Sequence, residues 1–391
     1  MGVRWARSSG AFAPRGMDRI GNRMLFGSRG RYGVLIFGIA FAVLLSTQQI
    51  AILLGVLQQA TGLLQNIGVP DIWVVSRDTI SVDYLREMHS RQLARVRAVP
   101  GVQWAEPLIS LAAIGELPNG GYYKMDIIGL SRSSKIGKPP VILEGQLANL
   151  ELPDTVFMEV SGRRHLPETR IGNFIHFQGR RARVVGTCRA KTGLTGNPVF
   201  YTSLDNSRRF FPQVENRLSM IMVKLENKDQ MGRVCRAING LPDITALRSD
   251  DFRWKSMQFI LFRTAIGLNF GITALLGFIV GLVLATTAFY QFTSDNLPYF
   301  ALLKAVGARD ASLIRIVLLQ SVTAGLIGYG IGIGLAGSIT LIGMRLDSAL
   351  TCRFPWPLLV AGMVPMLLCI GLGSFVNLRR VLRVDPVILF Q

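Results

Sequence analysis

Few residues of this sequence have the types and spacing of a catalytic site. Ser161 and His165 lie four residues apart, but a serine–histidine pair catalyses acyl transfer only with an orienting acid and an oxyanion donor, and no pattern for either accompanies them. The G-x-x-x-x-G-K-[ST] loop that cradles nucleotide phosphates does not occur in the chain. We therefore expect no catalytic residue, and no nucleotide bound by this chain through such a loop.

The histidines and cysteines do not predict a metal site. His89, His165 and His176 lie far apart in the sequence, without the cysteine or carboxylate neighbours that would complete a ligand set. Cys188 and Cys235 fall in one predicted domain, where a disulfide is chemically allowed but nothing shows that their Cα atoms approach each other. Two separate buried thiols are the default expectation, and a disulfide between them is the alternative.

Four long apolar stretches decide the class of protein. The chain has 391 residues, half of them hydrophobic, and a positive mean hydropathy despite a formal net charge of +19. A helix of about 20 apolar residues crosses a bilayer. We expect transmembrane helices at 33–58, 262–290, 312–343 and 355–376. The basic residues are scattered and no nucleic-acid-binding motif accompanies them, so nucleic acid is not an expected partner.

The distribution of arginine predicts the topology. The segment before the first span carries Arg4, Arg7, Arg15, Arg19, Arg23, Arg29 and Arg31 against Asp18, and the segment after the last carries Arg379, Arg380 and Arg383 against Asp385. Basic flanks stay in the cytoplasm, so both termini are predicted to be cytoplasmic. The first apolar stretch is too long for a signal peptide and is read as an uncleaved anchor. The remaining predicted boundaries are a basic arm at 1–32, an extracytoplasmic domain at 59–258, a cytoplasmic loop at 291–311, a short extracytoplasmic loop at 344–354 and a cytoplasmic tail at 377–391.

The long segment between the first two spans has the pattern of a soluble α+β domain. Strands are predicted at 71–75, 99–109, 122–130 and 218–225, with helices at 82–96 and 229–239. Short strands with glycine-rich and arginine-rich turns fill the segment from about 156 to 203. The predicted fold is therefore an α-helical integral membrane protein with four transmembrane helices and a large α+β extracytoplasmic domain, in which a small β-rich subdomain is inserted into a mixed one.

Pairs of glycines spaced by four residues mark the predicted second and third spans. Such spacing places both glycines on one helical face and lets two backbones approach closely. The pairs are Gly267 and Gly271, Gly277 and Gly281, Gly328 and Gly332, and Gly330 and Gly334. Packing within the chain is the first interpretation, and a seam between two copies of the chain is the alternative.

The predicted cytoplasmic loop contains a short helix. Asn296 can cap it, Pro298 suits its first turn, and Gly307 is placed to end it. If this helix binds a partner, Phe300 and Leu303 are expected as buried anchors, with Lys304 as a charge at the rim.

In this loop and at the C-terminal end, the sequence resembles the FtsX-like permease family of ABC transporters, whose MacB-type members have four spans. FALLKAVGA at 300–308 and LRRVLRVDPVILF at 378–390 resemble the family's two signatures. Blocks along most of the chain, including DIWVVSRD at 71–78, VPGVQWAEPLI at 99–109 and LLQSVTAGLIGYGIGIGLA at 318–336, resemble DevC-like subunits in particular. Many members have an acidic residue where this chain has Tyr299.

The resemblance implies a non-catalytic permease subunit of an ABC exporter in a bacterial inner membrane. ATP and Mg²⁺ would be bound by a separate ABC ATPase subunit, which contacts a coupling helix that includes Leu297, Pro298, Tyr299, Phe300, Leu303, Lys304, Ala305 and Gly307. Further implied features are a homodimer, mechanotransmission to the periplasmic domain, contact with membrane lipid, and a tripartite efflux system with a membrane-fusion (HlyD-like) adaptor and an outer-membrane channel. The alternative is an ATP-driven signalling subunit that regulates a cell-wall hydrolase.

Overall fold

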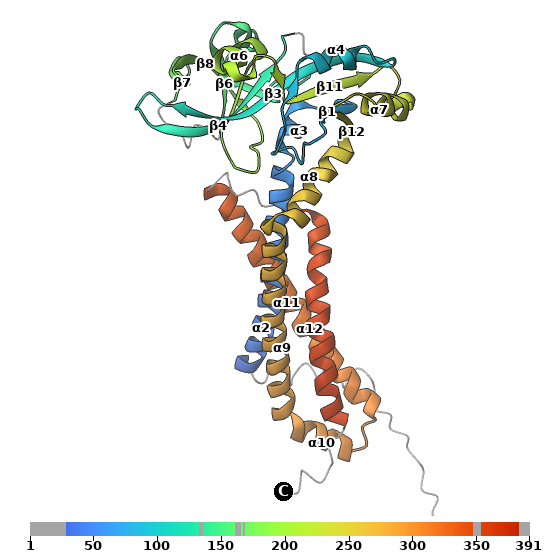
Figure 1. Ribbon diagram of the computed structural model, residues 1–391. Coiled ribbons are helices and arrows are strands. Elements are labelled where there is room, and N and C mark those ends of the chain that lie inside the picture. The colour runs from blue at the N-terminus through green and yellow to red at the C-terminus, as the bar shows by residue number, and fades with distance from the viewer. Residues whose placement is uncertain (1–28, 133–135, 161–165, 167–168, 347–352, 383–391) are drawn as a thin grey trace, which may run out of the picture. The chain divides into compact units, whose positions relative to one another are not determined.

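The computed structural model describes residues 29–132, 136–160, 166, 169–346 and 353–382 (Figure 1). The contacts divide the chain into two units. We call residues 1–53, 269–346 and 352–391 the helical unit, and residues 54–268 and 347–351 the α/β unit. Residues 1–28 of the basic arm predicted at 1–32 lie outside the described residues, as do parts of the loop at 344–354 and of the C-terminal tail.

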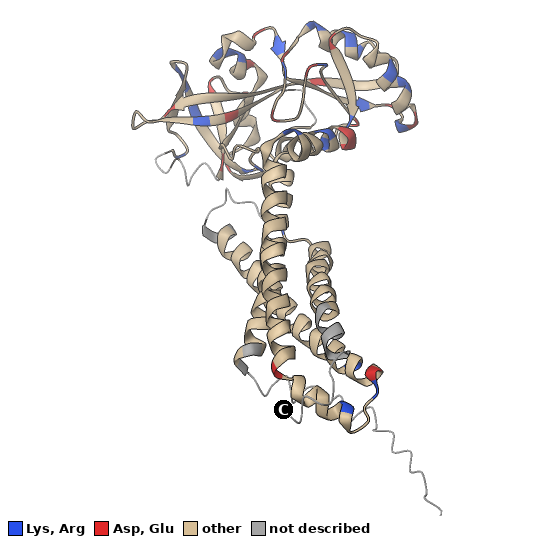
Figure 2. Cartoon of the chain, turned by 60° about the horizontal axis from the view of Figure 1, so that its bottom comes forward, with Lys and Arg blue, Asp and Glu red and all other residues tan. Residues whose placement is uncertain are grey.

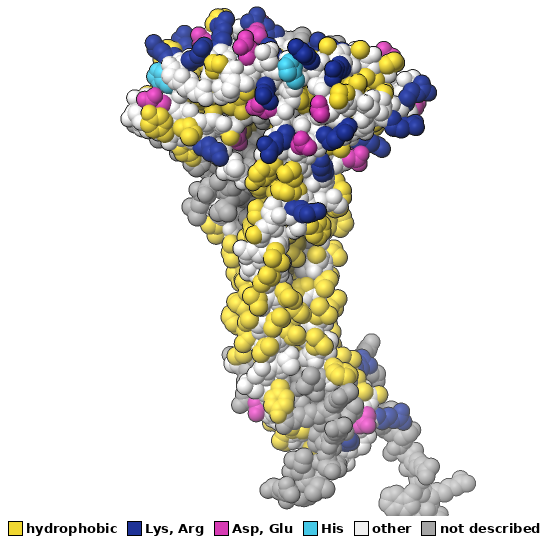
Figure 3. All heavy atoms as spheres, viewed as in Figure 1, with side chains coloured by type: hydrophobic (Ala, Val, Ile, Leu, Met, Phe, Trp, Pro, Cys, Tyr) yellow, Lys and Arg dark blue, Asp and Glu magenta, His cyan; other side chains and the backbone are white. Residues whose placement is uncertain are grey.

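Four long helices account for the apolar stretches of the sequence. They are α2 (Arg29–Gln59), α9 (Ala265–Asp295), α11 (Asp310–Leu346) and α12 (Trp356–Leu382). Each contains a segment of 20 or more residues that is apolar enough to cross a membrane. The prediction of four transmembrane helices is therefore confirmed. Hydrophobic side chains cover the visible outer surface of these helices, as expected for faces that contact lipid (Figure 3).

The helical unit is held together by a buried apolar cluster to which all four of its long helices contribute. Ile39 and Val43 of α2 pack in one buried cluster with Phe289 of α9 and with Met366 and Ile370 of α12. Polar side chains also connect helices of the unit, as interhelical hydrogen bonds do in membrane proteins. An example is Ser374 Oγ of α12, which donates to Ser321 Oγ of α11 at 2.8 Å.

The α/β unit contains one ten-stranded sheet and one two-stranded sheet. The large sheet has the order β12-β1-β11-β3-β4-β9-β6-β8-β5, and β7 pairs with both β3 and β8. Its strands are β1 (Ile72–Ser76), β3 (Val102–Glu116), β4 (Tyr122–Leu130), β5 (Val141–Glu144), β6 (Thr155–Glu159), β7 (Phe174–Phe177), β8 (Arg180–Arg189), β9 (Val199–Ser203), β11 (Met220–Leu225) and β12 (Ile244–Arg248). The short strands β2 (Met88–His89) and β10 (Arg217–Leu218) form the second sheet.

The long hairpin of β3 and β4 joins the two halves of the large sheet. The two strands are antiparallel, with nine residue pairs from Leu108↔Leu130 to Glu116↔Tyr122. On one side β3 pairs with β11, and on the other β4 pairs with β9 in parallel. The predicted β-rich segment from 156 to 203 thus extends the same sheet rather than forming a separate one.

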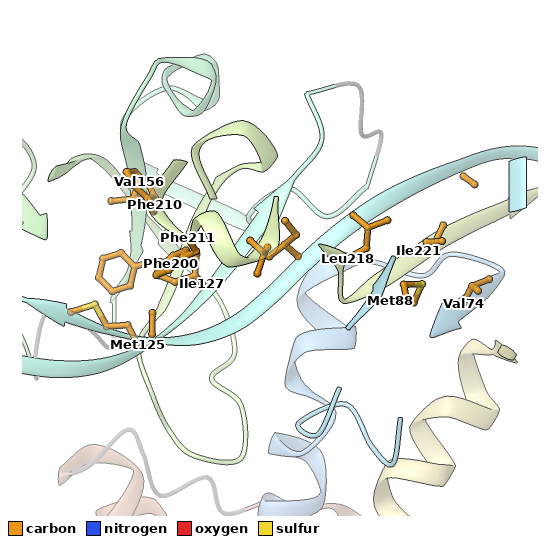
Figure 4. Packing of buried hydrophobic residues seen from close by; sticks show 14 of the residues in the cluster. Val74, Met88, Met125, Ile127, Val156, Phe200, Phe210, Phe211, Leu218 and Ile221 are labelled. Carbon is orange, nitrogen blue, oxygen red and sulfur yellow. The ribbon is translucent and has the colours of Figure 1, made fainter. Parts of the chain in front are cut away.

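Helices and two apolar clusters cover the sheet. The helices are α3 (Gly62–Ile67), α4 (Arg91–Arg97), α6 (Leu204–Phe210), α7 (Met231–Asn239) and α8 (Ser249–Arg263), with 3₁₀ turns at Leu147–Glu151, Pro212–Val214 and Lys228–Gln230. Alternate residues of β1 enter different clusters, because successive side chains of a strand point to opposite faces. Ile72 and Val74 belong to the first cluster, part of which is shown in Figure 4, and Trp73 and Val75 belong to the second.

Two expectations from the sequence are corrected here. The helix predicted at 82–96 is reduced to α4 (Arg91–Arg97), and a loop and β2 precede it. The loop is held by tertiary contacts, among them the Val82 N–H, which donates to Ser256 Oγ of α8 at 3.1 Å. The alternative of a disulfide is also wrong: Cys188 of β8 and Cys235 of α7 are both free thiols.

Candidate functional site

The short helix α10 (Leu297–Ala305) connects α9 to α11 and is the candidate coupling element. Asn296 occupies the position before the helix, but its side chain does not cap it; Asn296 Nδ2 donates instead to the Phe292 carbonyl at 2.8 Å. Pro298 lies in the first turn, as predicted. Gly307 follows the helix with φ +97°, a left-handed conformation that glycine adopts readily, and its N–H donates to the Lys304 carbonyl at 3.0 Å.

One face of α10 is packed inside the chain. The Phe300 side chain is 1% exposed and lies in a cluster with Leu313, Ile316 and Val317 of α11. Leu303 is partly buried against the same cluster. The expectation that Phe300 anchors a partner protein is therefore wrong, because its side chain is buried within the chain, whereas the same role for Leu303 stays a prediction. These side chains fix α10 to α11 because their apolar surface is already removed from water within the chain.

The opposite face of α10 is apolar and exposed. Tyr299 is 59% exposed, Leu302 is 52% exposed and Val306 is 63% exposed. Their spacing of three and four residues places them on one side of the helix. We call these three residues the coupling face. Leu302 and Val306 were missed from the sequence, because α10 is apolar on all sides and its periodicity does not distinguish the face that packs inside.

The remaining residues predicted for this site surround the coupling face. Pro298, Ala305 and Gly307 are exposed, and Leu297 is half-buried. Lys304 Nζ lies 3.7 Å from Asp310 Oδ1, at the start of α11. Figure 2 shows that charged residues are sparse on the described membrane helices and on α10, whereas the α/β unit carries many. A partner of α10 would thus meet an apolar helix with a basic residue at its edge.

The predicted glycine pairs divide between packed and open positions. A Cβ atom added to Gly277, Gly281, Gly328 or Gly332 would lie less than 3 Å from atoms of α2, so these four glycines pack within the chain. At Gly271, Gly330 and Gly334 an added Cβ would meet no atom within 4 Å. Gly267 is close to Leu261 of the α/β unit. Packing within the chain thus explains the pair 277/281 and the pair 328/332, and leaves the pair 330/334 without a contact.

The described residues of the α/β unit offer no sign of metal or thiol chemistry. Among them, no group of three or more His, Cys, Asp or Glu side chains could hold a metal ion. Burial, with a smaller contribution from Glu159, raises the pKa of Cys188 to about 12, and burial also raises the pKa of Cys235. Both thiols stay protonated at neutral pH, and a protonated thiol is a poor nucleophile.

Comparison with known proteins agrees with this architecture. Residues 33–241 match the MacB-like periplasmic core domain, and residues 271–386 match the FtsX-like permease C-terminal region. The first match covers α2 and most of the α/β unit, and the second covers α9 to α12. The part matched to the periplasmic core domain includes most of the α/β unit, which is therefore an extracytoplasmic domain.

The proteins compared here share little sequence with this chain. Two proteins from strains of Mycobacterium tuberculosis, each described as an uncharacterized ABC transporter permease, are 26% identical over 298 residues, which is 75% of this chain and 76% of theirs. The periplasmic region of MacB from Actinobacillus actinomycetemcomitans is 14% identical with a TM-score of 0.37, over 49% of this chain and 94% of that one. The extracellular domain of YknZ, a noncanonic ABC-type transporter from Gram-positive bacteria, is 12% identical with a TM-score of 0.35, over 46% and 100%.

The family assignment follows from the sequence-family matches, because the MacB-like core domain alone extends over more than half of the chain. The order of the two matches also agrees with the order of the units, since the α/β domain lies between the first and second membrane helices. The chain belongs to the MacB-like, FtsX-like permease family of ABC transporters.

Proposed function

We propose that the chain is the permease subunit of an ABC exporter, driven by a separate ATPase through the coupling face of α10. The observation that carries the proposal is the division of α10 into two faces. Phe300 fixes the helix to α11, while Tyr299, Leu302 and Val306 leave an exposed apolar surface. A helix that lies in a groove of its partner needs exposed apolar anchors of this kind on a rigid support.

In this scheme ATP and Mg²⁺ are bound by the partner, and the chain contributes movement. Closure of the ATPase would displace α10, and the Phe300 cluster would pass the displacement directly to α11. Both termini and α10 lie on the cytoplasmic side, and the α/β unit lies in the periplasm of a bacterial inner membrane. This is the mechanotransmission that the family resemblance implies.

A homodimer completes the proposed assembly. Gly330 and Gly334 of α11 leave open space at their Cα atoms, and the neighbouring Ile331 and Leu335 are 45% and 48% exposed. Glycines spaced by four residues on an exposed apolar face suit close approach of a second helix. We place the seam between two copies along this face of α11. A HlyD-like adaptor and an outer-membrane channel are further proposed partners, through the resemblance to DevC-like subunits.

The test is recovery of Mg-ATP hydrolysis with the purified chain. The tagged chain is purified from its native membrane in mild detergent, and ATP hydrolysis and bound ATP-binding proteins are measured for wild type and for Leu302→Glu. We expect the variant to lose both, because a carboxylate cannot be buried in an apolar groove without a large desolvation cost.

The matched control is Val69→Glu, which places the same charge at an apolar position in the α/β unit that is 75% exposed. This control should keep the ATPase. Equal ATPase recovery with Leu302→Glu and wild type would contradict the proposed role of the coupling face. A partner that hydrolyses ATP together with a bound cell-wall hydrolase would favour the signalling alternative over export.

A further inference from the structure

Two elements of the α/β unit lead to and from membrane helices. The entry connector comprises Gln59, at the end of α2, and α3, which begins at Gly62. The exit connector is α8, which ends at Arg263, two residues before α9. The two connectors are separated by almost 200 residues of sequence, so any coupling between them must pass through tertiary contacts.

A loop between β8 and β9, residues 190–198, is bonded to the entry connector. We call it the strap. The buried Asn66 side chain of α3 makes two hydrogen bonds with one residue of the strap: Asn66 Nδ2 donates to the Lys191 carbonyl at 2.6 Å, and the Lys191 N–H donates to Asn66 Oδ1 at 2.7 Å. Gln59 Nε2 donates to Thr192 Oγ1 at 3.1 Å. A Cβ added at Gly62 would lie 2.5 Å from the Thr192 carbonyl oxygen, so the two backbones are in close contact.

A second loop, residues 77–87, is bonded to the exit connector. We call it the bridging loop. The Val82 N–H donates to Ser256 Oγ at 3.1 Å, and Lys255 Nζ donates to the Thr79 carbonyl at 2.8 Å. The rings of Tyr84 and Phe259 meet edge to face, with 5.6 Å between their centroids. The bridging loop is thus fixed to α8 by polar and aromatic contacts.

The strap and the bridging loop meet at two carboxylates. The Leu194 N–H of the strap donates to Asp83 Oδ1 of the bridging loop at 3.4 Å, and Asn197 Nδ2 donates to Asp126 Oδ1 of β4 at 3.0 Å. Both carboxylates face Gly193: a Cβ added there would lie 3.2 Å from Asp83 Oδ1 and 3.6 Å from Asp126 Oδ2. The hydrogen bond to Asp83 is longer than those that fix either loop to its connector.

We propose that Asp83 and Asp126 are positioning residues that couple the two connectors. The Asp83 carboxylate holds the bridging loop against the strap, and the Asp126 carboxylate fixes the strap to β4. The contacts form a continuous path from α3 through the strap and the bridging loop to α8. Displacement of one connector is passed along this path to the other. The strap and the bridging loop separate where the long hydrogen bond between Leu194 and Asp83 breaks. The role of this coupling in transport rests on the proposed function. The coupling itself requires no ATPase, because all of its contacts lie within this chain.

The junction responds to protons because both carboxylates are partly removed from water. Burial, with a further contribution from the charge of Asp126, raises the pKa of Asp83 to about 6, although the hydrogen bond from Leu194 opposes the shift. Burial also raises the pKa of Asp126, which the Asn197 hydrogen bond and Lys124 oppose. Lys124, Lys191 and Glu87 line the same cavity of about 390 Å³. A raised pKa means that the closed junction binds a proton more tightly than separated loops do, so closure is favoured as the pH falls through about 6.

Hydrogen–deuterium exchange of the full-length chain in lipid nanodiscs tests the path without any ATPase. Asn66→Ala releases the strap from the entry connector. We expect exchange to rise several-fold in the strap and also in residues 82–85 of the bridging loop. Gln59→Ala, which removes the hydrogen bond to Thr192, repeats the test with less disturbance of the fold. A rise confined to the strap in both variants would overturn the coupling.

The pH arm tests the carboxylates themselves. After correction for intrinsic exchange, the strap of the wild-type chain should be several-fold better protected at pH 5 than at pH 7.5. In Asp83→Asn the strap should be as well protected at pH 7.5 as it is in wild type at pH 5. Asp78→Asn, which changes an exposed residue of the same loop, should behave as wild type. Equal protection of the wild-type strap at both pH values would refute the role of the carboxylates. Loss of ATPase binding in other experiments would leave these results unchanged.

Discussion

The helix α10 and the junction between the strap and the bridging loop are built from opposite kinds of contact. Phe300 fixes α10 through apolar contacts with Leu313 and Ile316, whereas the junction depends on hydrogen bonds to Asp83 and Asp126. Apolar packing is indifferent to pH and transmits displacement because interiors are close-packed. Hydrogen bonds to carboxylates change with protonation. The comparison teaches that α10, the element proposed to contact the ATPase, is fixed by packing that does not depend on pH, whereas the junction in the α/β unit changes with protonation.

The largest expected loss of stability comes from removing the apolar contacts that fix α10 to α11. Phe300→Ala removes a fully buried ring, and truncations of this kind cost about 3–5 kcal/mol. We expect a lower denaturation temperature in detergent and rapid proteolysis of the segment 294–312, at any pH between 5 and 8. The control Leu302→Ala, at a position 52% exposed, should change stability by less than about 1 kcal/mol. Similar stability of both variants would contradict the assignment of the two faces.

The second prediction concerns the close packing of α11 against α2. In Gly332→Leu the new side chain would overlap α2, because an added Cβ already lies 2.7 Å from the Ala40 carbonyl oxygen, and overpacking costs about 1–3 kcal/mol. Gly330→Leu meets open space and should leave the stability of the single chain unchanged. If α11 forms the dimer seam, Gly330→Leu should instead shift the chain to monomers in light-scattering measurements. A larger loss of stability in Gly330→Leu than in Gly332→Leu would contradict the division of glycines into packed and open positions.

The third prediction concerns the strongest polar contact of the strap. Asn66→Ala removes two hydrogen bonds to Lys191, and each contributes about 0.5–1.5 kcal/mol. Thermal denaturation of the variant should show a loss of about 1–3 kcal/mol, smaller than that of Phe300→Ala. A loss below that of the surface variant Leu302→Ala would show that the strap is not fixed to α3 by this side chain.

The fourth prediction is that the stability of the junction depends on pH, whereas the packing of α10 does not. Burial raises the pKa of Asp83 from its ordinary value of 3.8 to about 6. Its stabilising contribution is therefore complete below about pH 3.8 and is lost as the pH rises through about 6. Because Asp83 is partly exposed, solvent screening should limit the effect to about 1 kcal/mol or less. Urea unfolding of the α/β unit within the full-length chain at pH 5 and pH 7.5 measures this contribution. The difference in the free energy of unfolding between the two pH values should be smaller in Asp83→Asn than in wild type.

The smallest effect is expected at Lys304. Its ammonium lies 3.7 Å from Asp310, whose side chain is 60% exposed. Exposed ion pairs contribute about 0–1 kcal/mol, and salt weakens them further. Lys304→Ala should therefore leave the denaturation temperature within about 1 °C of wild type at 0.5 M salt. A large loss would mean that α10 is held by charge as well as by Phe300.

The sequence predicted those elements whose residues carry a strong local signal. Membrane helices follow from length and apolarity. The strand predicted at 122–130 coincides with β4 (Tyr122–Leu130), which pairs with β3 along its whole length. The helix predicted at 82–96 was largely wrong. Helical periodicity is present there, but Val82 and Tyr84 are held by α8, a segment more than 160 residues away in the sequence.

The face of α10 could not be chosen from the sequence for a related reason. Phe300 and Leu303 form one apolar pair and Tyr299 and Leu302 another, so both sides of the helix look suitable for a partner. The choice is made by α11, whose Leu313 covers Phe300. The same holds for the glycines of α11, where contact with α2 separates Gly332 from Gly330. Local spacing identifies a helical face, and only tertiary packing shows what that face contacts.

Site-specific photo-crosslinking tests the central claim most directly. A benzophenone side chain is introduced at position 302 on the coupling face or at position 314, a partly buried position on α11, and the native membranes are irradiated with and without ATP. The account predicts a crosslink from position 302 to an ATP-binding subunit, with a yield that changes with ATP, and none from position 314. A crosslink of equal yield from both positions, or an ATP-binding subunit that is captured only from position 314, would contradict the claim that α10 receives the movement through Tyr299, Leu302 and Val306.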